Sequence, residues 1–472
     1  MSKSSSMMKK SLIYFAGNFS SKIFGVIIIP IYAQYLSAAQ LGDYDFQQTV
    51  GNLLMPIIGL AIWEAILRFG LNAEGNELHE IITTAIFVLA ATLSVSFMLL
   101  FIAYTNFYGF STLTFLYVLL IMTMPIVTVF GYISRALGKS TLFAFSGVVS
   151  AGVNMLGLFI LVVSMNKGLL GLLLSAILSN VFNILFLMIG TRIFSIVKRK
   201  YFSKKWAKKM IYFSAPLILN LVFGWFISSF SRFYIKLTIG STENGIYAFA
   251  SKFSGILLQL AGIINMSAIE DAVSSIGDND WVKRFENNIE NISSLFIQFS
   301  CLLIGVTGVY YNFVSNEDFK RSIILVPFLL LVAIFTNTST LIGNIFPVFN
   351  KTGKAFTTTM IGGVTNILLS IVLGFFFGLI GIVVAQLVAS ITLVLSRYYY
   401  GQKIQKYSIN IAKFLKLLIF FLAISFISIS GNLLIQLITV LLTSVIVIIL
   451  NRTWIITIVS RIKTRIDKRR GN

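Results

Sequence analysis

The sequence is short of the residues that build covalent and metal-based sites. Its 472 residues include one cysteine, Cys301, and one histidine, His79. A single cysteine excludes a disulfide within the chain. A zinc site needs three or four Cys, His or acidic ligands close together, and the sequence shows no such group. We therefore expect no metal ion and no cofactor.

Negative charge is scarce as well. The chain carries 16 Asp and Glu against 37 Lys and Arg, which gives a net charge of +21. In a soluble protein this excess would suggest a nucleic-acid partner. Here the basic residues gather in short loops between apolar runs, which is the topology signal of a membrane protein. We therefore expect membrane lipids as partners and no nucleic acid.

Motifs for catalysis and for nucleotide binding are missing. Gly138-Lys139-Ser140 resembles the end of a P-loop, but the glycine that the motif needs five residues earlier is replaced by Ile133. ATP is therefore not expected to drive the protein directly. The sequence also has no Gly-x-Ser-x-Gly or HExxH motif and no paired acids deep in an apolar run, so we expect no enzyme.

Long apolar runs are abundant. Hydrophobic residues make up 57% of the chain, charged residues 11%, and the mean hydropathy is +0.90. Because a spanning helix needs about 20 apolar residues, these runs predict an all-α polytopic membrane protein with about 14 transmembrane helices. The predicted spans are residues 11–36, 43–68, 81–104, 112–134, 141–165, 169–191, 209–236, 244–269, 291–312, 322–348, 355–377, 379–400, 414–431 and 433–457.

The basic residues predict how the spans are oriented. With a cytoplasmic N-terminus, 30 of the 37 Lys and Arg fall in inward segments, 3 in outward loops and 4 within spans. Positive charge favours the cytoplasmic side of short loops. The pattern therefore predicts a multi-pass protein with both termini in the cytoplasm.

The two halves of the chain share short matches. Gly42-Asp43-Tyr44-Asp45-Phe46 corresponds to Gly245-Ile246-Tyr247-Ala248-Phe249, 203 residues later, and Gly168-Leu169-Leu170-Gly171 corresponds to Gly378-Leu379-Ile380-Gly381, 210 residues later. Matches that occur in the same order and at nearly the same offset in both halves indicate a duplication. Because six spans per unit is an even number, we predict two parallel six-helix lobes, residues 1–198 and 199–406. Two C-terminal helices and a basic cytoplasmic tail follow in residues 407–472.

Apart from the basic residues counted above at the cytoplasmic ends of spans, four lie inside predicted spans: Lys22, Arg232, Lys236 and Lys252. A cation in hydrocarbon is expensive, and few acids lie near these in the sequence, so we interpret them as a cationic, substrate-binding cavity. For Lys22 and Lys252 the alternative is a buried structural pair with an acid. For Arg232 and Lys236, which share a helical face near the predicted outer end of a span, the alternative is contact with lipid headgroups.

Four further residues are candidates for gating or coupling: Asn18, Asp43, Glu64 and Arg68. Asn18 lies one turn before the first of the cations named above, on the same face. Asp43, with Asp45, begins a predicted span, where acids suit a helix N-terminus, so capping is the first interpretation. Glu64 and Arg68 have the spacing and order of a favourable local ion pair, so a structural clamp is the first interpretation.

A basic linker, Arg192 to Lys209, joins the two predicted lobes on the cytoplasmic side. Two interpretations stay open. The linker is either a solvated loop that only marks topology, or a segment attracted to anionic lipid or lipid-linked phosphate. Parallel lobes joined in this way suggest a cleft between them and alternating access.

Several motifs along the chain carry a family resemblance: Pro30-Ile31-Tyr32-Ala33-Gln34-Tyr35-Leu36-Ser37, Gly42-Asp43-Tyr44, Arg68-Phe69, Ser231-Arg232, Gly245-Ile246-Tyr247-Ala248 with Lys252, and Gly378-Leu379-Ile380-Gly381. With these motifs the chain resembles, over essentially its whole length, polysaccharide flippases of the Wzx type. Those proteins belong to the multidrug/oligosaccharidyl-lipid/polysaccharide exporter superfamily.

The resemblance implies two six-helix lobes plus two extra helices and a V-shaped alternating-access cycle in the bacterial cytoplasmic (inner) membrane. The implied cargo is an undecaprenyl-diphosphate-linked oligosaccharide moved from the cytoplasmic to the outer leaflet. The family's cationic central cavity maps onto Lys22, Arg232 and Lys252. The family often has arginine there, and lysine at 22 and 252 would grip a diphosphate less firmly, since lysine cannot bind it in a bidentate manner.

We therefore expect a flippase for surface polysaccharide biosynthesis. Its cargo would be a polyprenyl-diphosphate-linked glycan, and a polysaccharide polymerase is considered as a further partner. One alternative is a multidrug or cation antiporter of the same superfamily, which should have deep carboxylates. The other is a non-transporting scaffold of a glycan polymerase complex, which predicts deep lysines neutralised by acids.

Overall fold

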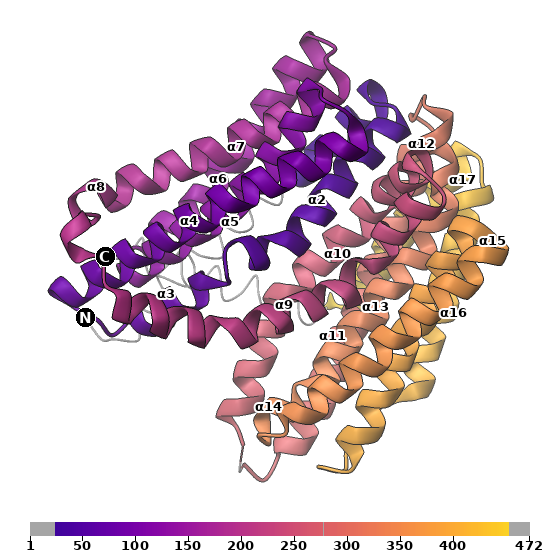
Figure 1. Ribbon diagram of the computed structural model, residues 1–472. Helices are drawn as coiled ribbons and strands as arrows, with labels where there is room; N and C mark the ends of the chain where they lie inside the picture. The colour runs from indigo at the N-terminus through magenta and orange to yellow at the C-terminus, as the bar shows by residue number, and fades with distance from the viewer. Residues whose placement is uncertain (1–23, 277, 453–472) are drawn as a thin grey trace, which may run out of the picture. The chain divides into compact units, whose positions relative to one another are not determined.

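A computed structural model describes residues 24–276 and 278–452 (Figure 1). Within these ranges the chain folds into helices and contains no β-strand. The described part of the first predicted span, Phe24–Tyr35, is helical. Lys22 and Asn18, and the predicted tail from residue 453 onward, lie outside the described residues.

The helices follow one another along the chain with short connections. They are α2 (Ala38–Ile58), α3 (Ile62–Gly70), α4 (Gly75–Tyr108), α5 (Thr112–Ala136), α6 (Ser140–Gly157), the π-helix η1 (Leu158–Ser164), α7 (Gly168–Thr191), α8 (Ile193–Ile196), the 3₁₀-helix η2 (Arg199–Tyr201), α9 (Lys204–Thr238), α10 (Ser241–Ser274), α11 (Trp281–Tyr311), α12 (Glu317–Arg321), the 3₁₀-helix η3 (Ser322–Ile324), α13 (Leu325–Gly343), α14 (Ile345–Val348), α15 (Thr352–Gln402), α16 (Ile411–Ser430) and α17 (Leu433–Leu450).

The all-helical membrane fold is confirmed, but the number of 14 spans is not. Among the described residues, 11 helices are long and apolar enough to cross a membrane, or up to 12 if one bent pair is counted as a single span. The bent pair is α2 and α3, which meet at 54° where a single span, 43–68, was predicted. The break follows Pro56 and Gly59, and both Leu60 and Ala61 adopt left-handed φ angles of 49° and 46°.

Helix α15 is two spans that turn back on each other. A straight helix of 51 residues would be about 76 Å long, more than twice the roughly 30 Å of the bilayer core. The chain reverses at Gly378, where φ is 56° and ψ is −136°. Beyond the turn, Arg397 Nη2 donates to Thr359 Oγ1 at 3.1 Å, although 38 residues separate them. The break that the sequence predicts between 355–377 and 379–400 therefore exists.

The chain divides into two compact units, and each unit is made of two separate stretches of the sequence. Unit 1 holds residues 1–252 and 362–386, and unit 2 holds residues 253–361 and 387–472. The division into lobes 1–198 and 199–406 remains a prediction about duplicated segments.

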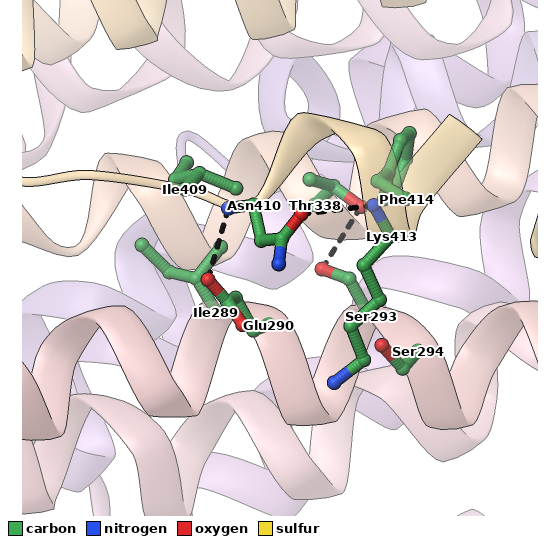
Figure 2. Close-up of a pocket in the computed structure, with 9 residues that line it drawn as sticks. All are labelled: Ile289, Glu290, Ser293, Ser294, Thr338, Ile409, Asn410, Lys413 and Phe414. Carbon is green, nitrogen blue, oxygen red and sulfur yellow. Dashed lines mark hydrogen bonds between the residues drawn. The ribbon is translucent and has the colours of Figure 1, made fainter. Parts of the chain in front are cut away.

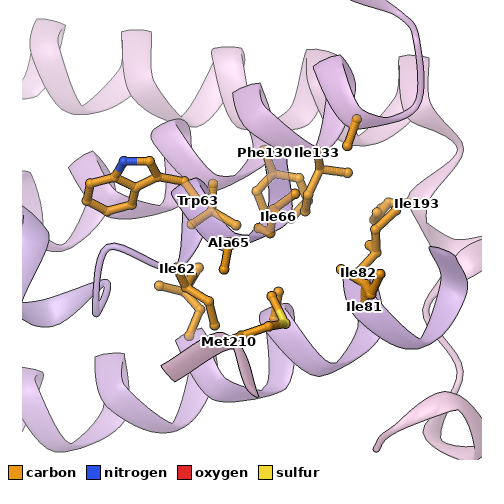
Figure 3. Packing of buried hydrophobic residues seen from close by; sticks show 14 of the residues in the cluster. Ile62, Trp63, Ala65, Ile66, Ile81, Ile82, Phe130, Ile133, Ile193 and Met210 are labelled. Carbon is orange, nitrogen blue, oxygen red and sulfur yellow. The ribbon is translucent and has the colours of Figure 1, made fainter. Parts of the chain in front are cut away.

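Unit 1 has an apolar core around the short helix α3. Ile62, Trp63 and Ile66 of α3 pack with Ile81 and Ile82 of α4 (Figure 3). Phe130 and Ile133 of α5, Ile193 and Ile196 of α8, and Met210 of α9 complete this core. The core therefore ties the linker after α7 to the helices on either side of it.

Unit 2 is built around α11, on which α16 and α17 pack. Small residues allow close approach: a Cβ added to Gly308 would meet Ser428 of α16, and one added to Gly305 would meet Val440 of α17. Amide side chains add hydrogen bonds between α11 and α17, from Asn312 to Gln436 at 2.5 Å and from Asn451 to Gln298 at 2.5 Å. Such small residues and polar contacts are what hold helices together in lipid.

Candidate functional site

Helices α2 and α9 meet the first part of α10 where the sequence places Arg232, Lys236 and Lys252. The beginning of α2 crosses the beginning of α10 with backbone against backbone. A Cβ added to Gly42 would collide with the carbonyl oxygen of Ser241, and one added to Gly245 would collide with that of Ala38. Asn244 Nδ2 also donates to the Gly42 carbonyl at 2.8 Å. Only glycine permits this approach.

The crossing brings α9 against α2 and positions two ion pairs. Arg232 Nη1 of α9 lies 3.0 Å from Asp45 Oδ1 of α2, and its Nη2 donates to Ser251 Oγ of α10 at 3.1 Å. The guanidinium also lies 5.6 Å from the ring centre of Tyr247. One turn further along α9, Lys236 pairs with Asp43, and both groups bond to Ser241, whose Oγ lies 2.7 Å from Asp43 Oδ1.

These ion pairs correct two interpretations of the sequence. Arg232 and Lys236 do not lack acids, because the carboxylates come from α2, nearly 200 residues away in the chain. Both cations are tied to α2, with the Arg232 side chain 34% exposed and that of Lys236 16% exposed, and contact with headgroups stays an alternative. The acids are also not caps: α2 begins at Ala38, Ser37 is its N-cap, and its first turn holds no acid.

Lys252 of α10 has a different environment. It is half-buried, and its ammonium lies 5.5 Å from the ring centre of Tyr32. Among the described residues no carboxylate lies within 4 Å of the Lys252 ammonium, the distance limit of an ion pair. Asp45 is buried, and its second oxygen, Oδ2, has no hydrogen-bond partner in the described part of the chain. As far as residues 24–276 and 278–452 show, the cluster therefore keeps one cation without an ion pair and one buried acceptor atom without a donor.

Glu64 and Arg68 are not part of this cluster, and the predicted clamp between them is wrong. Glu64 Oε1 accepts from Trp63 Nε1 at 3.1 Å and from the Tyr132 hydroxyl at 3.5 Å. Arg68 is exposed, and within the described residues it makes no ion pair with Glu64. The kink before α3 turns the Glu64 side chain toward aromatic donors of its own helix and of α5.

Several polar members of the cluster were not recognised from the sequence. Ser241, Asn244, Tyr247 and Ser251 all come from the first turns of α10. Their only signal in the sequence is that they lie within or beside the repeated motif Gly245-Ile246-Tyr247-Ala248-Phe249. Serine, asparagine and tyrosine at such positions can hold either a carboxylate or another oxyanion, because each can donate a hydrogen bond.

Unit 2 contains a separate small pocket at the beginning of α16. Figure 2 shows its lining, from Ile289, Glu290, Ser293, Ser294, Thr338, Ile409, Asn410, Lys413 and Phe414. Its polar groups are largely satisfied locally: the Asn410 backbone N–H donates to Glu290 Oε1 at 2.9 Å, and Asn410 Oδ1 caps α16 at the Lys413 N–H. We assign this pocket to the attachment of the loop before α16. No group of three metal-ligating side chains occurs in the described segments.

The fold resembles that of known membrane transporters. The solved structure of the lipid II flippase MurJ in an inward closed conformation matches with a TM-score of 0.69 and 20% identity, covering 94% of this chain and all of that one. An inward-facing multidrug resistance MATE family transporter of the MOP superfamily matches with a TM-score of 0.56 and 15% identity over 84% of this chain and 99% of the other. A MATE structure in the straight conformation matches at 0.53, with 15% identity over 84% and 95%. The chain is thus a multi-pass membrane protein with a transporter fold.

The family itself is given by a sequence match. A family model described as "Polysaccharide biosynthesis protein" matches residues 7–269, which is more than half of the chain. The protein therefore belongs to the polysaccharide biosynthesis protein family, and the resemblance to polysaccharide exporters of this superfamily is confirmed. No curated protein sequence matches the chain.

Proposed function

We propose that the protein is a flippase that moves an undecaprenyl-diphosphate-linked oligosaccharide from the cytoplasmic to the outer leaflet of a bacterial inner membrane. The family match and the fold support a transporter in polysaccharide biosynthesis. The observation that supports a negatively charged cargo concerns Lys252. This residue lies in a helix long enough to span the membrane, and among the described residues no carboxylate lies within ion-pair distance of it. A cation held in this way is stabilised when an anion binds beside it.

The ion pairs give this proposal a mechanism. Breaking a largely buried ion pair leaves uncompensated charges and costs about 3–5 kcal/mol. A diphosphate that approaches Lys252 can replace Asp45 and Asp43 as the partner of Arg232 and Lys236, so the pairs would open at lower cost with cargo than without it. Ser251, Ser241 and Asn244 can donate to phosphate oxygens after the exchange.

Alternating access then follows from the crossing of α2 and α10. In the proposed orientation both termini are cytoplasmic, and this crossing lies toward the outer face. When the crossing is closed, the cargo site opens toward the cytoplasm. The proposed lobes, 1–198 and 199–406, would separate at this crossing when the ion pairs exchange their carboxylates for phosphate. Lys22, the cation of the first predicted span, is proposed to join Lys252 in holding the diphosphate.

The central experiment replaces Lys252 in the full-length protein. Lys252→Ala and Lys252→Gln should reduce surface polysaccharide in complemented cells by at least about tenfold, and Lys252→Arg should retain it, because arginine keeps the charge. Lys167→Ala, at an exposed residue just before α7, is the matched control. Protein levels are measured by immunoblot. Wild-type polysaccharide from Lys252→Ala at normal protein level would overturn the proposal.

Each alternative function also has a supporting observation. Asp45 Oδ2, buried and without a donor among the residues that the structure describes, could take a proton or a cation, as a multidrug or cation antiporter requires. For that function Asp45→Asn should raise sensitivity to cationic drugs and leave polysaccharide unchanged. The neutralised Arg232 and Lys236 fit a scaffold for a polymerase, which would tolerate Lys252→Ala but lose polymer when its surface contacts are disrupted.

A further inference from the structure

The linker between α7 and α9 is folded onto unit 1 rather than left as an open loop. Its apolar residues Ile193 and Ile196 are buried in the core around α3. Backbone contacts fix its path: Thr83 Oγ1 donates to the Ile196 carbonyl at 3.4 Å, and the Ser203 N–H donates to Thr84 Oγ1 at 3.1 Å. A loop that served only to mark topology would need none of these contacts.

Ring contacts hold the same segment against α4. The Tyr201 ring lies 5.3 Å from that of His79, and the Phe202 ring lies 5.7 Å from that of Phe87. A third ring of the segment, that of Trp206, lies 5.6 Å from the Phe69 ring of α3. These contacts attach the backbone between α7 and α9 to unit 1.

The exposed residues of the segment are mostly basic, the others being Phe194, Ser195 and Phe202. Its eight cations are all exposed, and within the described chain none has a carboxylate within 4 Å: Arg192, Lys198, Arg199, Lys200, Lys204, Lys205, Lys208 and Lys209. No acidic residue occurs between residues 192 and 209. We call these eight residues the basic platform. Because repulsion among like charges disfavours such a surface, an anionic partner would stabilise it.

Aromatic rings position part of the platform. The Lys209 ammonium lies 4.3 Å from the ring centre of Trp206 and 4.7 Å from that of Phe69, and the Lys200 ammonium lies 4.9 Å from the Tyr201 ring centre. Next to the platform, Phe194 and Tyr212 are 76% and 84% exposed. Basic residues interleaved with exposed aromatic residues are typical of a surface at the boundary between hydrocarbon and headgroups.

We propose that the basic platform binds the headgroups of anionic phospholipids in the cytoplasmic leaflet. The segment must lie at a membrane boundary, since it connects two helices that span the bilayer. Its charge is complementary to an anionic leaflet, which attracts basic residues near its surface. Ile193 and Ile196 of the segment are buried in unit 1, whereas all eight cations stay exposed and available to that leaflet. The occupant is the phospholipid surface and not the diphosphate cargo, so the inference is independent of the transport function.

The test measures lipid selectivity of the full-length protein in vesicles. Spin-labelled phosphatidylglycerol and phosphatidylcholine are compared at the protein boundary by electron paramagnetic resonance. The quadruple variant Lys198→Gln, Arg199→Gln, Lys204→Gln and Lys205→Gln spares the two ring-bound lysines. We expect each lost contact to lower the preference for phosphatidylglycerol about fivefold at low salt. High salt should abolish the preference of the wild type, because exposed charges are screened.

The matched control neutralises four exposed lysines of unit 2: Lys351→Gln, Lys406→Gln, Lys413→Gln and Lys416→Gln. It has the same change in net charge and should keep most of the selectivity. Equal loss in both quadruple variants, or no selectivity in the wild type, would overturn the inference. So would displacement of phosphatidylglycerol by an equal amount of polyprenyl diphosphate, because the platform would then be a docking site for cargo.

Discussion

Gly42 and Gly245 pack against each other in a reciprocal way. A Cβ on Gly42 would strike the Ser241 carbonyl, and a Cβ on Gly245 would strike the Ala38 carbonyl. Ala38 and Ser241 are separated by 203 residues, as Gly42 and Gly245 are. The contact therefore maps onto itself when the two repeated motifs are exchanged, as an isologous contact does about a two-fold axis. This symmetry independently supports the duplication inferred from the sequence.

Alanine at either glycine should prevent the crossing of α2 and α10 from closing. The added methyl meets backbone atoms, which cannot rotate away, so we expect a loss of about 1–3 kcal/mol in stability from overpacking. Apparent melting temperature in detergent micelles should fall for Gly42→Ala and Gly245→Ala. Gly152→Ala is the control, because a Cβ there meets nothing within 4 Å. Unchanged melting in all three variants would show that the crossing can move apart without cost.

Loss of Asp45 should destabilise the protein more than loss of Asp43. The Asp45 side chain is 8% exposed and that of Asp43 is 30% exposed, so water and salt screen the Asp45 carboxylate less and its attraction to its cation is stronger. We expect about 3–5 kcal/mol for Asp45→Asn, and less for Asp43→Asn. Asp318→Asn, which breaks an exposed 3.8 Å pair with Arg321, should change stability by about 1 kcal/mol at most.

A charge exchange tests whether the pairing itself matters. The double variant Asp43→Lys with Lys236→Asp should recover much of the stability that each single change loses, because the pair is restored with reversed polarity. A double variant no more stable than the worse single variant would contradict an ion pair at this position. Thermal unfolding of the four proteins in one detergent provides the comparison.

Gly378 should not tolerate a side chain. Its φ of 56° and ψ of −136° belong to a conformation that residues with a Cβ rarely adopt, so Gly378→Ala should cost about 1–3 kcal/mol by strain. A Cβ at Gly378 would meet nothing within 4 Å, and the penalty would therefore arise from the backbone and not from a collision. Gly147→Ala, also in open space but with ordinary helical geometry, is the control. Equal melting temperatures for the two variants would rule out backbone strain at the turn.

The sequence predicted well what depends on local pattern. Apolar runs of about 20 residues predicted most helices, and the glycine pair of Gly378 and Gly381 predicted the reversal within α15. The basic residues within α9 and α10 were identified because a charge in an apolar run stands out.

What the sequence could not predict depends on contacts across the fold. Asp45 lies 187 residues before Arg232, so no local pattern pairs them, and each acid looked like a helix cap. The break after Ile58 was missed because Leu60 and Ala61 are not residues that usually adopt left-handed angles. Arg397 falls within the predicted span 379–400, and no local pattern shows that its guanidinium lies between α13 and the other arm of α15, where it donates to the Ser339 carbonyl at 3.0 Å.

The segment Gly362–Gln386 has a consequence for how the protein is made. It belongs to unit 1, yet the ribosome synthesises it after residues 253–361 of unit 2. The amino-terminal unit therefore cannot finish folding while the chain is being inserted up to residue 361. The last hairpin of unit 1 is synthesised at a later stage of translation. A chain that is truncated before this segment would therefore have neither unit complete.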